Sequence, residues 1–546
     1  MEQPSSKSTS LLSLPPEIQT QILSHLVSSF GKPSIHAVLR TCKQLYEVAL
    51  PLSVYVFRNA APFSDGGGVC SRARNVQFLR YIVISKPELA IHVKTLLLGR
   101  FSSKPDAATH IKDIAQPKDT NCTKEELLVY QHTIEDVLDR LNYDGDRNWS
   151  AEWVEDLNKG CSDAQVALIM LVCPNIESLI FEQATQPRQF IRLLQMVGSL
   201  NSLKLPLGKV NVNQLSIPLS KVEDVFQEAT EFEEGYEMFH EQGPIIFHLP
   251  RLRFYEGNLI YGHVLAAESF DRLQPGSSPV EEIALRASTI AGPTLASLFK
   301  ACRALKKFEY THNSFLNQYN EIKPSEIMEA LLLHAETLED VHVNMHDEWD
   351  KGWEWKNHPE CLYMGTRLSQ LHSLKKLTVS SQCLTGILAG PPINNDMHPP
   401  PMPIRIEEAP SLIECLPESL ESLKILACGD EIWETATELL RTVEQGVRFT
   451  KLTHICFLFY EWLMKSKMDL HCYSPRVRLE IGYQNQRFSE FDMGYPNDET
   501  EARRQHNTTS RIYAPDFRKL YLGMRELAVF PDSVYEPWPD PFNYEV

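Results

Sequence analysis

The sequence predicts an α/β fold in which a small helical segment at the N-terminus precedes a long region of helices and short parallel strands. Residues 11–57 carry apolar side chains at helical spacing. From about residue 91 a motif of the form apolar-x-x-apolar-x-apolar recurs along the chain. Many copies follow a helix-like segment and a short turn, which is the order expected of repeated helix–strand units.

The composition is that of a globular protein. The chain has 546 residues, of which 43% are hydrophobic and 23% charged, so it is long enough for several domains. Its formal net charge of −18 argues against a nucleic-acid partner, which usually meets a basic face. The same charge disfavours binding to an anionic membrane surface. Residues 1–10 are polar, and we expect them to form a disordered tail.

The cysteine pattern indicates an intracellular protein. Twelve cysteines are spread singly with no C-x-x-C pair, so we expect reduced thiols in the cytoplasm or nucleus. The first residues lack the basic-then-apolar pattern of a signal peptide. The longest apolar run, residues 166–173, is too short to span a bilayer, so no membrane partner is expected.

Residues 11–57 are expected to form three short helices. The stretch from Leu14 to Ile18 is typical of a helix start, because proline is pre-organised for the first turn and Glu17 complements the helix dipole. We expect Pro51 to end the third helix. The apolar stripes of the three helices are Ile18, Ile22, Leu23 and Leu26, then Ile35, Val38, Leu39 and Cys42, and finally Leu45, Tyr46 and Ala49.

The order of motifs in residues 11–57 resembles an F-box, in the form common in filamentous fungi. The matching pieces are L-P-x-E-I, then I-L-x-x-L, then T-C-K-x-L-Y. The resemblance implies a helical module that binds a Skp-type adaptor and through it the cullin of an SCF-type ubiquitin ligase. The alternative is an ordinary amphipathic subdomain packed on the rest of the chain. The residues implied for adaptor binding are Leu14, Pro15, Glu17, Ile18, Ile22, Leu23, Leu26, Leu39, Cys42 and Leu45.

Residues 58–90 are interpreted as a linker that contains a loop and one helix. The glycine run near residue 66 predicts the loop. The stretch from Arg72 to Ile84 predicts the helix, because Val76, Leu79 and Val83 are spaced for one face.

Residues 91–483 contain the recurring motif. The last two apolar residues of each copy alternate as on a short strand with one buried face. The gap between the first two copies holds a predicted helix, Thr123 to Leu141, with Thr123 and Glu126 as capping residues. The copies are Val93/Leu96/Leu98, Ile176/Leu179/Phe181, Leu200/Leu203/Leu205, Leu249/Leu252/Phe254, Val280/Ile283/Leu285, Leu305/Phe308/Tyr310, Leu338/Val341/Val343, Leu374/Leu377/Val379, Leu420/Leu423/Ile425 and Leu452/Ile455/Phe457.

This pattern resembles the irregular leucine-rich repeats that follow many F-boxes. Each unit would be one helix and one strand, and stacking would give a solenoid with a curved parallel sheet whose concave face is available to a protein substrate. The spacing between copies is uneven and an asparagine ladder is missing from the sequence. A non-repeating α/β domain is therefore the alternative.

Four segments depart from the repeat pattern. The acidic residues 223–241 are expected to form a solvated helix or loop, or to bind a basic partner. The proline-rich residues 391–403 are expected to form a loop, and residues 484–546 a proline- and aromatic-rich C-terminal extension. The candidate substrate-binding residues are Trp349, Trp353 and Trp355, since tryptophan is favoured at interfaces, although they could instead brace their own loop.

The sequence lacks a persuasive catalytic or ligand-binding constellation. It has no phosphate loop, no G-x-S-x-G elbow and no H-E-x-x-H motif. His342, His346 and nearby acids fit polar surface groups better than a metal site. We therefore expect no catalytic residues, cofactor or metal. The leading hypothesis is a non-enzymatic substrate receptor, with a scaffold outside ubiquitin transfer as the second and a hydrolase or transferase as the third.

Overall fold

The computed structural model describes residues 11–30, 32–59, 72–104, 122–143, 148–182, 184–202, 217–228, 238–312, 322–345, 363–386, 411–429, 432–460, 470 and 474–484. Within these ranges the chain is an α/β protein built on a parallel sheet of 13 strands. The predicted fold class is confirmed at this level. Residues 1–10, the region of Trp349, Trp353 and Trp355, the loop 391–403 and nearly all of 484–546 lie outside the described residues.

The N-terminal part consists of helices. A 3₁₀ turn, Leu11–Ser13, precedes α1 (Pro16–Phe30), α2 (Lys32–Leu39) and α3 (Lys43–Ser53). The expectation that Pro51 ends the third helix is wrong, because α3 continues to Ser53. Pro51 lies in the last turn, where its missing N–H removes a single helical hydrogen bond and the chain then leaves the helix. The apolar spacing of residues 11–57 did predict the three helices.

The sheet begins immediately after α3. Its strands are β1 (Val56–Arg58), β2 (Thr95–Leu98), β4 (Ser178–Glu182), β6 (Asp224–Glu228), β7 (Phe254–Asn258), β8 (Tyr261–Gly262), β9 (Glu282–Ile290), β10 (Lys307–His312), β11 (Asp340–Asn344), β12 (Lys376–Ser380), β13 (Ser422–Cys428), β14 (His454–Tyr460) and β15 (Arg478–Gln484). Strands follow one another in sequence order across the sheet, and β8 pairs with β9 beside the main path. A separate pair, β3 (Phe101–Ser102) and β5 (Ala184–Thr185), completes the described strands.

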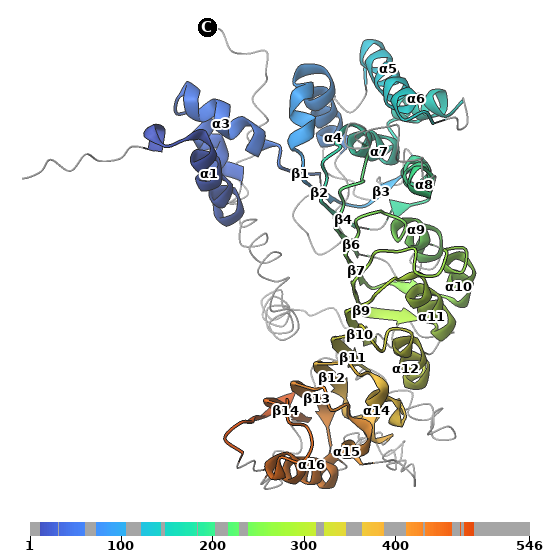
Figure 1. Ribbon diagram of the computed structural model, residues 1–546. Helices are drawn as coiled ribbons and strands as arrows, with labels where there is room; N and C mark the ends of the chain where they lie inside the picture. Colours follow the sequence, from blue (N-terminus) through green and yellow to red (C-terminus); the bar gives the residue numbers. More distant parts are fainter. Residues whose placement is uncertain are drawn as a thin grey trace, which may run out of the picture.

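Helices connect the strands and cover one face of the sheet. Short helical turns Arg80–Ser85 and Pro87–His92 follow α4 (Arg72–Leu79) before β2. Helices α8 to α12 lie along one side of a curved column of strands (Figure 1). The later helices are α5 (Lys124–Arg140), α6 (Trp149–Asn158), α7 (Ser162–Val172), α8 (Gln189–Ser202), α9 (Met238–Ile246), α10 (Val264–Phe270), α11 (Gly292–Ala301), α12 (Pro324–Leu332), a 3₁₀ helix (Thr366–Gln370), α14 (Ser381–Thr385), α15 (Leu412–Cys415) and α16 (Trp433–Gln445).

One register row of apolar residues runs through the whole sheet. Each member pairs with the next across a parallel ladder, and nearly all are buried under the helices. This row explains why the motif recurs, since every unit must contribute one apolar residue to the same continuous core. The row comprises Phe57, Leu96, Leu179, Val225, Tyr255, Ile283, Phe308, Val341, Leu377, Leu423, Ile455 and Leu479.

Two sequence predictions in the repeat region are wrong. Residues 224–228 of the acidic segment form the inner strand β6 and not a solvated helix or loop, because Val225 and Gln227 face the core while the charged residues point the other way. The motif copy ending at Phe254 is displaced, since Tyr255 and not Leu252 occupies the central row. Leu203 and Leu205, the predicted strand residues of the copy beginning at Leu200, lie outside the described residues, and its Leu200 lies in α8, which continues to Ser202.

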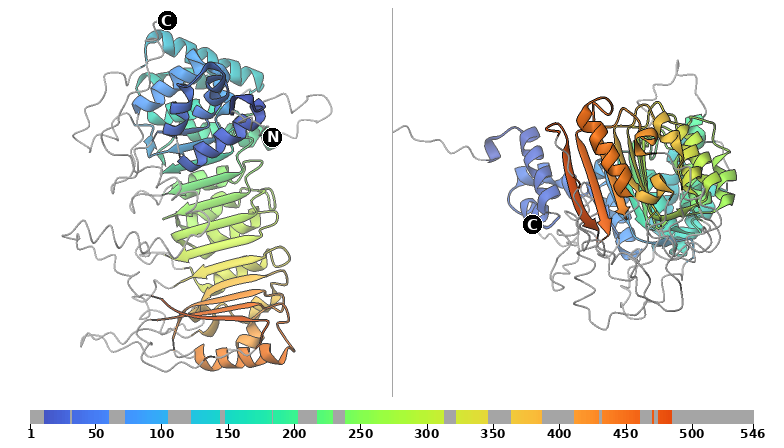
Figure 2. Two further views of the ribbon diagram at one scale, coloured as in Figure 1. Left: turned by 90° about the vertical axis from the view of Figure 1, so that its left-hand side faces the viewer. Right: turned by 90° about the horizontal axis from the view of Figure 1, so that it is seen from below.

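The opposite face of the sheet carries a different set of residues. Figure 2 shows it turned to the viewer, with α1 to α3 in front of its β1 end. Alternation along each strand places residues such as Phe226, Glu256 and Arg286 on this face. The predicted helix between the first two motif copies is confirmed as α5, and its Thr123 and Glu126 form the reciprocal capping box.

Candidate functional site

The three N-terminal helices pack around a small core of their own. Among the residues described there, Leu23, Ile35, Ala49 and Leu52 are buried and contact one another separately from the core of the sheet. The preceding turn is held by two side chains, because Gln19 Nε2 donates to the Leu14 carbonyl at 2.7 Å and Gln44 Nε2 donates to the Leu12 carbonyl at 3.1 Å. The helices and the turn before them therefore form one unit, which we call the helical unit (residues 11–53).

The helical unit exposes apolar side chains on its outer surface. Ile18 and Ile22, one turn apart on α1, are 41% and 38% exposed, and Leu12 is 43% exposed. Tyr46 of α3 is 40% exposed. Large apolar side chains that remain in water contribute no burial free energy to the fold. These side chains are available for contact with a partner.

The residues predicted to bind an adaptor divide into two groups. Pro15, Glu17, Ile18 and Ile22 are exposed, and Leu14, Leu39 and Cys42 are half-buried. Leu23 and Leu45 are buried, so both belong to the interior and cannot contact a partner directly. The side chain of Leu26 lies outside the described residues.

A cavity of about 560 Å³ lies where the helical unit meets the sheet region. Thr20 of α1 and Glu47 of α3 line one side, and His92 and Lys94 line the other. Tyr55 connects the two parts, because its carbonyl accepts hydrogen bonds from the N–H groups of Lys94 and Thr95 at 2.9 and 3.1 Å. The helical unit is thus attached to the edge of the sheet through a short, hydrogen-bonded segment.

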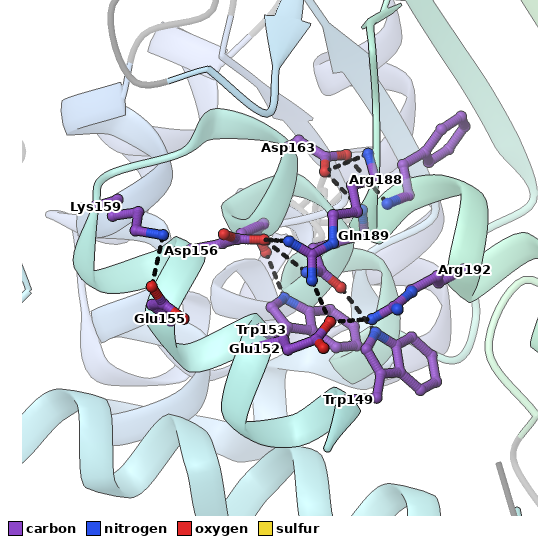
Figure 3. Close-up of polar contacts among 12 residues, drawn as sticks. Trp149, Glu152, Trp153, Glu155, Asp156, Lys159, Asp163, Arg188, Gln189 and Arg192 are labelled. Atoms are coloured by element: carbon purple, nitrogen blue, oxygen red, sulfur yellow. Dashed lines mark hydrogen bonds and ion pairs between the residues drawn. The ribbon is translucent and has the colours of Figure 1, made fainter. Parts of the chain in front are cut away.

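A buried polar network joins α6, α7 and the start of α8 (Figure 3). The Asp163 carboxylate accepts hydrogen bonds from the backbone N–H groups of Arg188, Gln189 and Phe190, at 2.9, 2.6 and 3.1 Å. These are first-turn donors that a helix cannot satisfy itself. Burial raises the pKa of Asp163 to about 6, and the three N–H donors act against that rise.

The side chains around Asp163 satisfy one another. Trp149 Nε1 donates to Gln189 Oε1 at 2.7 Å, and Gln189 Nε2 donates to Asp156 Oδ2 at 2.7 Å. Arg192 Nη1 donates to Glu152 Oε2 at 2.7 Å, and Arg188 pairs with the same carboxylate. These donors and acceptors form hydrogen bonds with one another, so the network holds the three helices together.

A second polar cluster lies on the sheet face opposite the helices. Arg286 of β9 donates from Nη1 to Glu256 at 2.9 Å, and from Nε and Nη2 to Glu309 at 2.8 and 3.2 Å. Glu256 is 7% exposed and Glu309 is 8% exposed. We call these three residues the Arg286 cluster.

The two carboxylates of the Arg286 cluster differ in acidity. Burial raises the pKa of Glu256 to about 7 despite the charge of Arg286. Burial also acts to raise the pKa of Glu309, but the hydrogen bonds from Arg286 and the charge of Arg286 together outweigh it, so this pKa lies below the ordinary value. The neighbouring His342 of β11 has a lowered pKa because of burial, so it is neutral near pH 7.

Sequence reasoning missed the Arg286 cluster. Its three residues come from strands that are far apart in the chain, and only the register places Glu256, Ala284 and Glu309 in one row. The available signal was the alternation of each strand, which assigns these residues to the face away from the helices. In the described part of the chain no group of three or more potential metal ligands gathers.

Family models and curated proteins were compared with this chain. No protein-family model matches it, and no curated protein matches it at a significant level. In the part of the chain that the structure describes, no helix is both long and apolar enough to cross a membrane. The function is therefore inferred from the residues and their geometry.

Proposed function

We propose that the protein is the substrate-recognition subunit of an SCF-type cullin ubiquitin ligase. The helical unit would be its F-box and would bind a Skp-type adaptor. The observation that carries this proposal is the pair Ile18 and Ile22, which lies exposed on α1 within the F-box-like motif order while Leu23 of the same helix fills the core. An apolar stripe on a helix is a common means of docking onto another protein.

The sheet region would be an irregular leucine-rich-repeat-like solenoid that receives the substrate. The sequential order of parallel strands and the single apolar register row support this proposal. In this role the chain performs no bond chemistry and works by bringing a protein substrate close to the ligase. The protein would act in the cytoplasm, the nucleus or both.

Binding to a purified Skp-type adaptor tests the proposal. We expect the full chain to bind, and the double variant Ile18→Ser/Ile22→Ser to lose at least about tenfold in affinity, because exposed apolar contacts at an interface centre carry much of the binding energy. Both side chains lie at the surface, so the variant should retain the helical content of the parent chain.

A matched control is available on α10. Val264 and Leu265 are 44% and 61% exposed, and replacing both by serine removes similar apolar surface far from the helical unit. This variant should bind the adaptor as the parent does. Equal binding by all three chains would contradict the proposed docking face, and a folded parent chain that fails to bind would exclude the F-box assignment.

Cullin association separates the two protein-interaction hypotheses. A complex that contains the chain, the adaptor and a cullin is expected for a ligase receptor. A complex with the adaptor that excludes the cullin would instead indicate a scaffold outside ubiquitin transfer.

A further inference from the structure

The sheet face opposite the helices contains a carboxylate oxygen without a partner. Oε1 of Glu256 accepts from Arg286, while Oε2 of the same carboxylate is buried and has no hydrogen-bond partner among the described residues. A buried carboxylate oxygen left without a donor is costly, so its retention calls for an explanation.

Arg286 cannot supply the missing donor in this arrangement. Its Nε and Nη2 are directed to the two oxygens of Glu309, and its Nη1 is directed to Oε1 of Glu256. The guanidinium therefore forms ion pairs with both carboxylates, with two hydrogen bonds to Glu309 and one to Glu256. Two carboxylates share the hydrogen bonds of one guanidinium, while the charge of Lys307 also acts on both.

Two aromatic residues are neighbours of Glu256 on this face of the sheet. Phe226 of β6 pairs with Glu256 in the parallel register, and Phe254 precedes Glu256 by two residues on the same face. The rings of Phe226 and Phe254 are 5.1 Å apart and tilted by 57°. Both residues are half-buried.

A carboxylate flanked by aromatic rings suits a cationic group. The carboxylate accepts a hydrogen bond from an ammonium or guanidinium, and a ring face attracts the same positive charge. The same face carries two acidic residues beside Phe254. Asp224 pairs with Phe254 in register on one side, and Glu282 pairs with Phe254 on the other side. Two acidic residues flank Phe254, and one basic residue, Lys307, follows Glu282 in the same row, so the surroundings of the rings disfavour an anionic ligand.

We propose that Glu256, Phe226 and Phe254 form a subsite for a lysine or arginine side chain of a protein partner. The cation donates to Oε2 of Glu256 and lies against the two rings. This inference rests on the proposed function in one respect, because it names the chemistry of the substrate that the sheet region would receive. The geometry of these three residues does not depend on adaptor binding.

Peptide selection followed by titration tests the subsite. A random peptide library is selected on the full chain above pH 7, where the Glu256 carboxylate is ionised. We expect lysine or arginine to be enriched at one position relative to the unselected library. In titration calorimetry, replacing that lysine by norleucine or that arginine by citrulline should weaken binding at least about tenfold, because each change removes the charge.

Protein variants test the same contact from the other side. Glu256→Gln should weaken binding at least about tenfold and abolish the preference for the charged peptide, while Phe254→Leu should weaken it severalfold. Glu155→Gln is the matched control, because Glu155 lies on α6 and pairs with Lys159 there. This variant should bind as the parent does.

Three results would overturn the subsite. They are a selected set without basic enrichment, equal affinity for charged and neutral peptides, and an unchanged affinity in a folded Glu256→Gln variant. The peptide replacements use the parent chain, so they decide the question even where a variant misfolds. Adaptor binding is measured on the same preparations, and its loss without a change in peptide binding would count against the ligase function alone.

Discussion

The helical unit and the sheet region bury their apolar side chains in different ways. The buried core described in the helical unit is Leu23, Ile35, Ala49 and Leu52, and the same unit leaves Ile18 and Ile22 exposed. The sheet region instead has one contiguous core that extends from Val54 to Val477. A small core supplies little stability, so the helical unit depends on its attachment to the sheet and on any partner that covers its surface.

The difference predicts that the two regions respond differently to loss of one leucine. Leu23→Ala should cost about 2–5 kcal/mol, because it removes a fully buried side chain from a core with few neighbours to close the gap. We expect this cost to unfold the helical unit while the sheet stays folded. Hydrogen exchange should show fast amides in α1 to α3 and protected amides in β9 to β12.

Leu377→Ala is the matched change in the sheet. Leu377 is 1% exposed and lies in the central register row, so the substitution should lower the stability of the whole sheet region without selective opening of the helices. A single cooperative loss of protection in both variants would show that the two regions are not separate in stability.

The Arg286 cluster gives the sheet region a pH dependence. Burial raises the folded-state pKa of Glu256 to about 7, above its ordinary value in an unfolded chain. Its stabilising contribution is thus fully present below the unfolded pKa and is lost as pH rises through 7. The expected loss is up to about 3 kcal/mol.

Comparison with Glu256→Gln isolates this effect. The variant has no carboxyl group to ionise, so the difference in free energy of unfolding between variant and parent should change between about pH 4 and pH 8 in the variant's favour. Denaturant melts at a series of pH values measure it. A constant difference across that range would mean that Glu256 titrates normally.

The sequence predicted those features whose signal is local. The capping box of α5 lies within four residues, and the apolar pair of each strand lies within three, so both could be found without knowing the fold. The strand β6 was missed because its polar side chains Asp224 and Glu228 dominate a segment in which only Val225 shows the apolar row. Local charge suggested solvent, whereas the register places this segment inside the sheet.

The two candidate sites differ in the same way, because only one of them has a local signal in the sequence. The exposed stripe on α1 belongs to a helix, and its spacing is visible in the sequence, although the sequence alone did not separate Ile18 and Ile22 from the buried Leu23. The Arg286 cluster brings together β7, β9 and β10, and its existence depends on which strands are neighbours. Pairing across a sheet is not encoded in short spacing.

Removing the Asp163 carboxylate should destabilise the sheet region by about 2 kcal/mol. Asp163→Asn keeps the size of the side chain but replaces one acceptor oxygen by a donor, which opposes the backbone N–H groups at the start of α8. Thermal melting measures the loss. Glu155→Gln is the control, since its exposed pair with Lys159 contributes little, and equal effects from both changes would contradict the role of Asp163.

The smallest expected effect is a gain in stability at a strained backbone position. Ala287 lies in β9 with φ of 44°, a left-handed conformation that costs an L-residue with a Cβ roughly 1 kcal/mol. Ala287→Gly removes this cost, so we expect the free energy of unfolding to rise by about 0.5–1 kcal/mol. Ala284→Gly in the same strand is the control, because Ala284 is buried in the parallel ladder and not among the positive-φ residues described. There glycine adds chain entropy and removes a buried methyl group, so it should lower stability. Opposite signs for these two alanine-to-glycine changes would show that the backbone at Ala287 is strained. The same sign for both changes would contradict that strain.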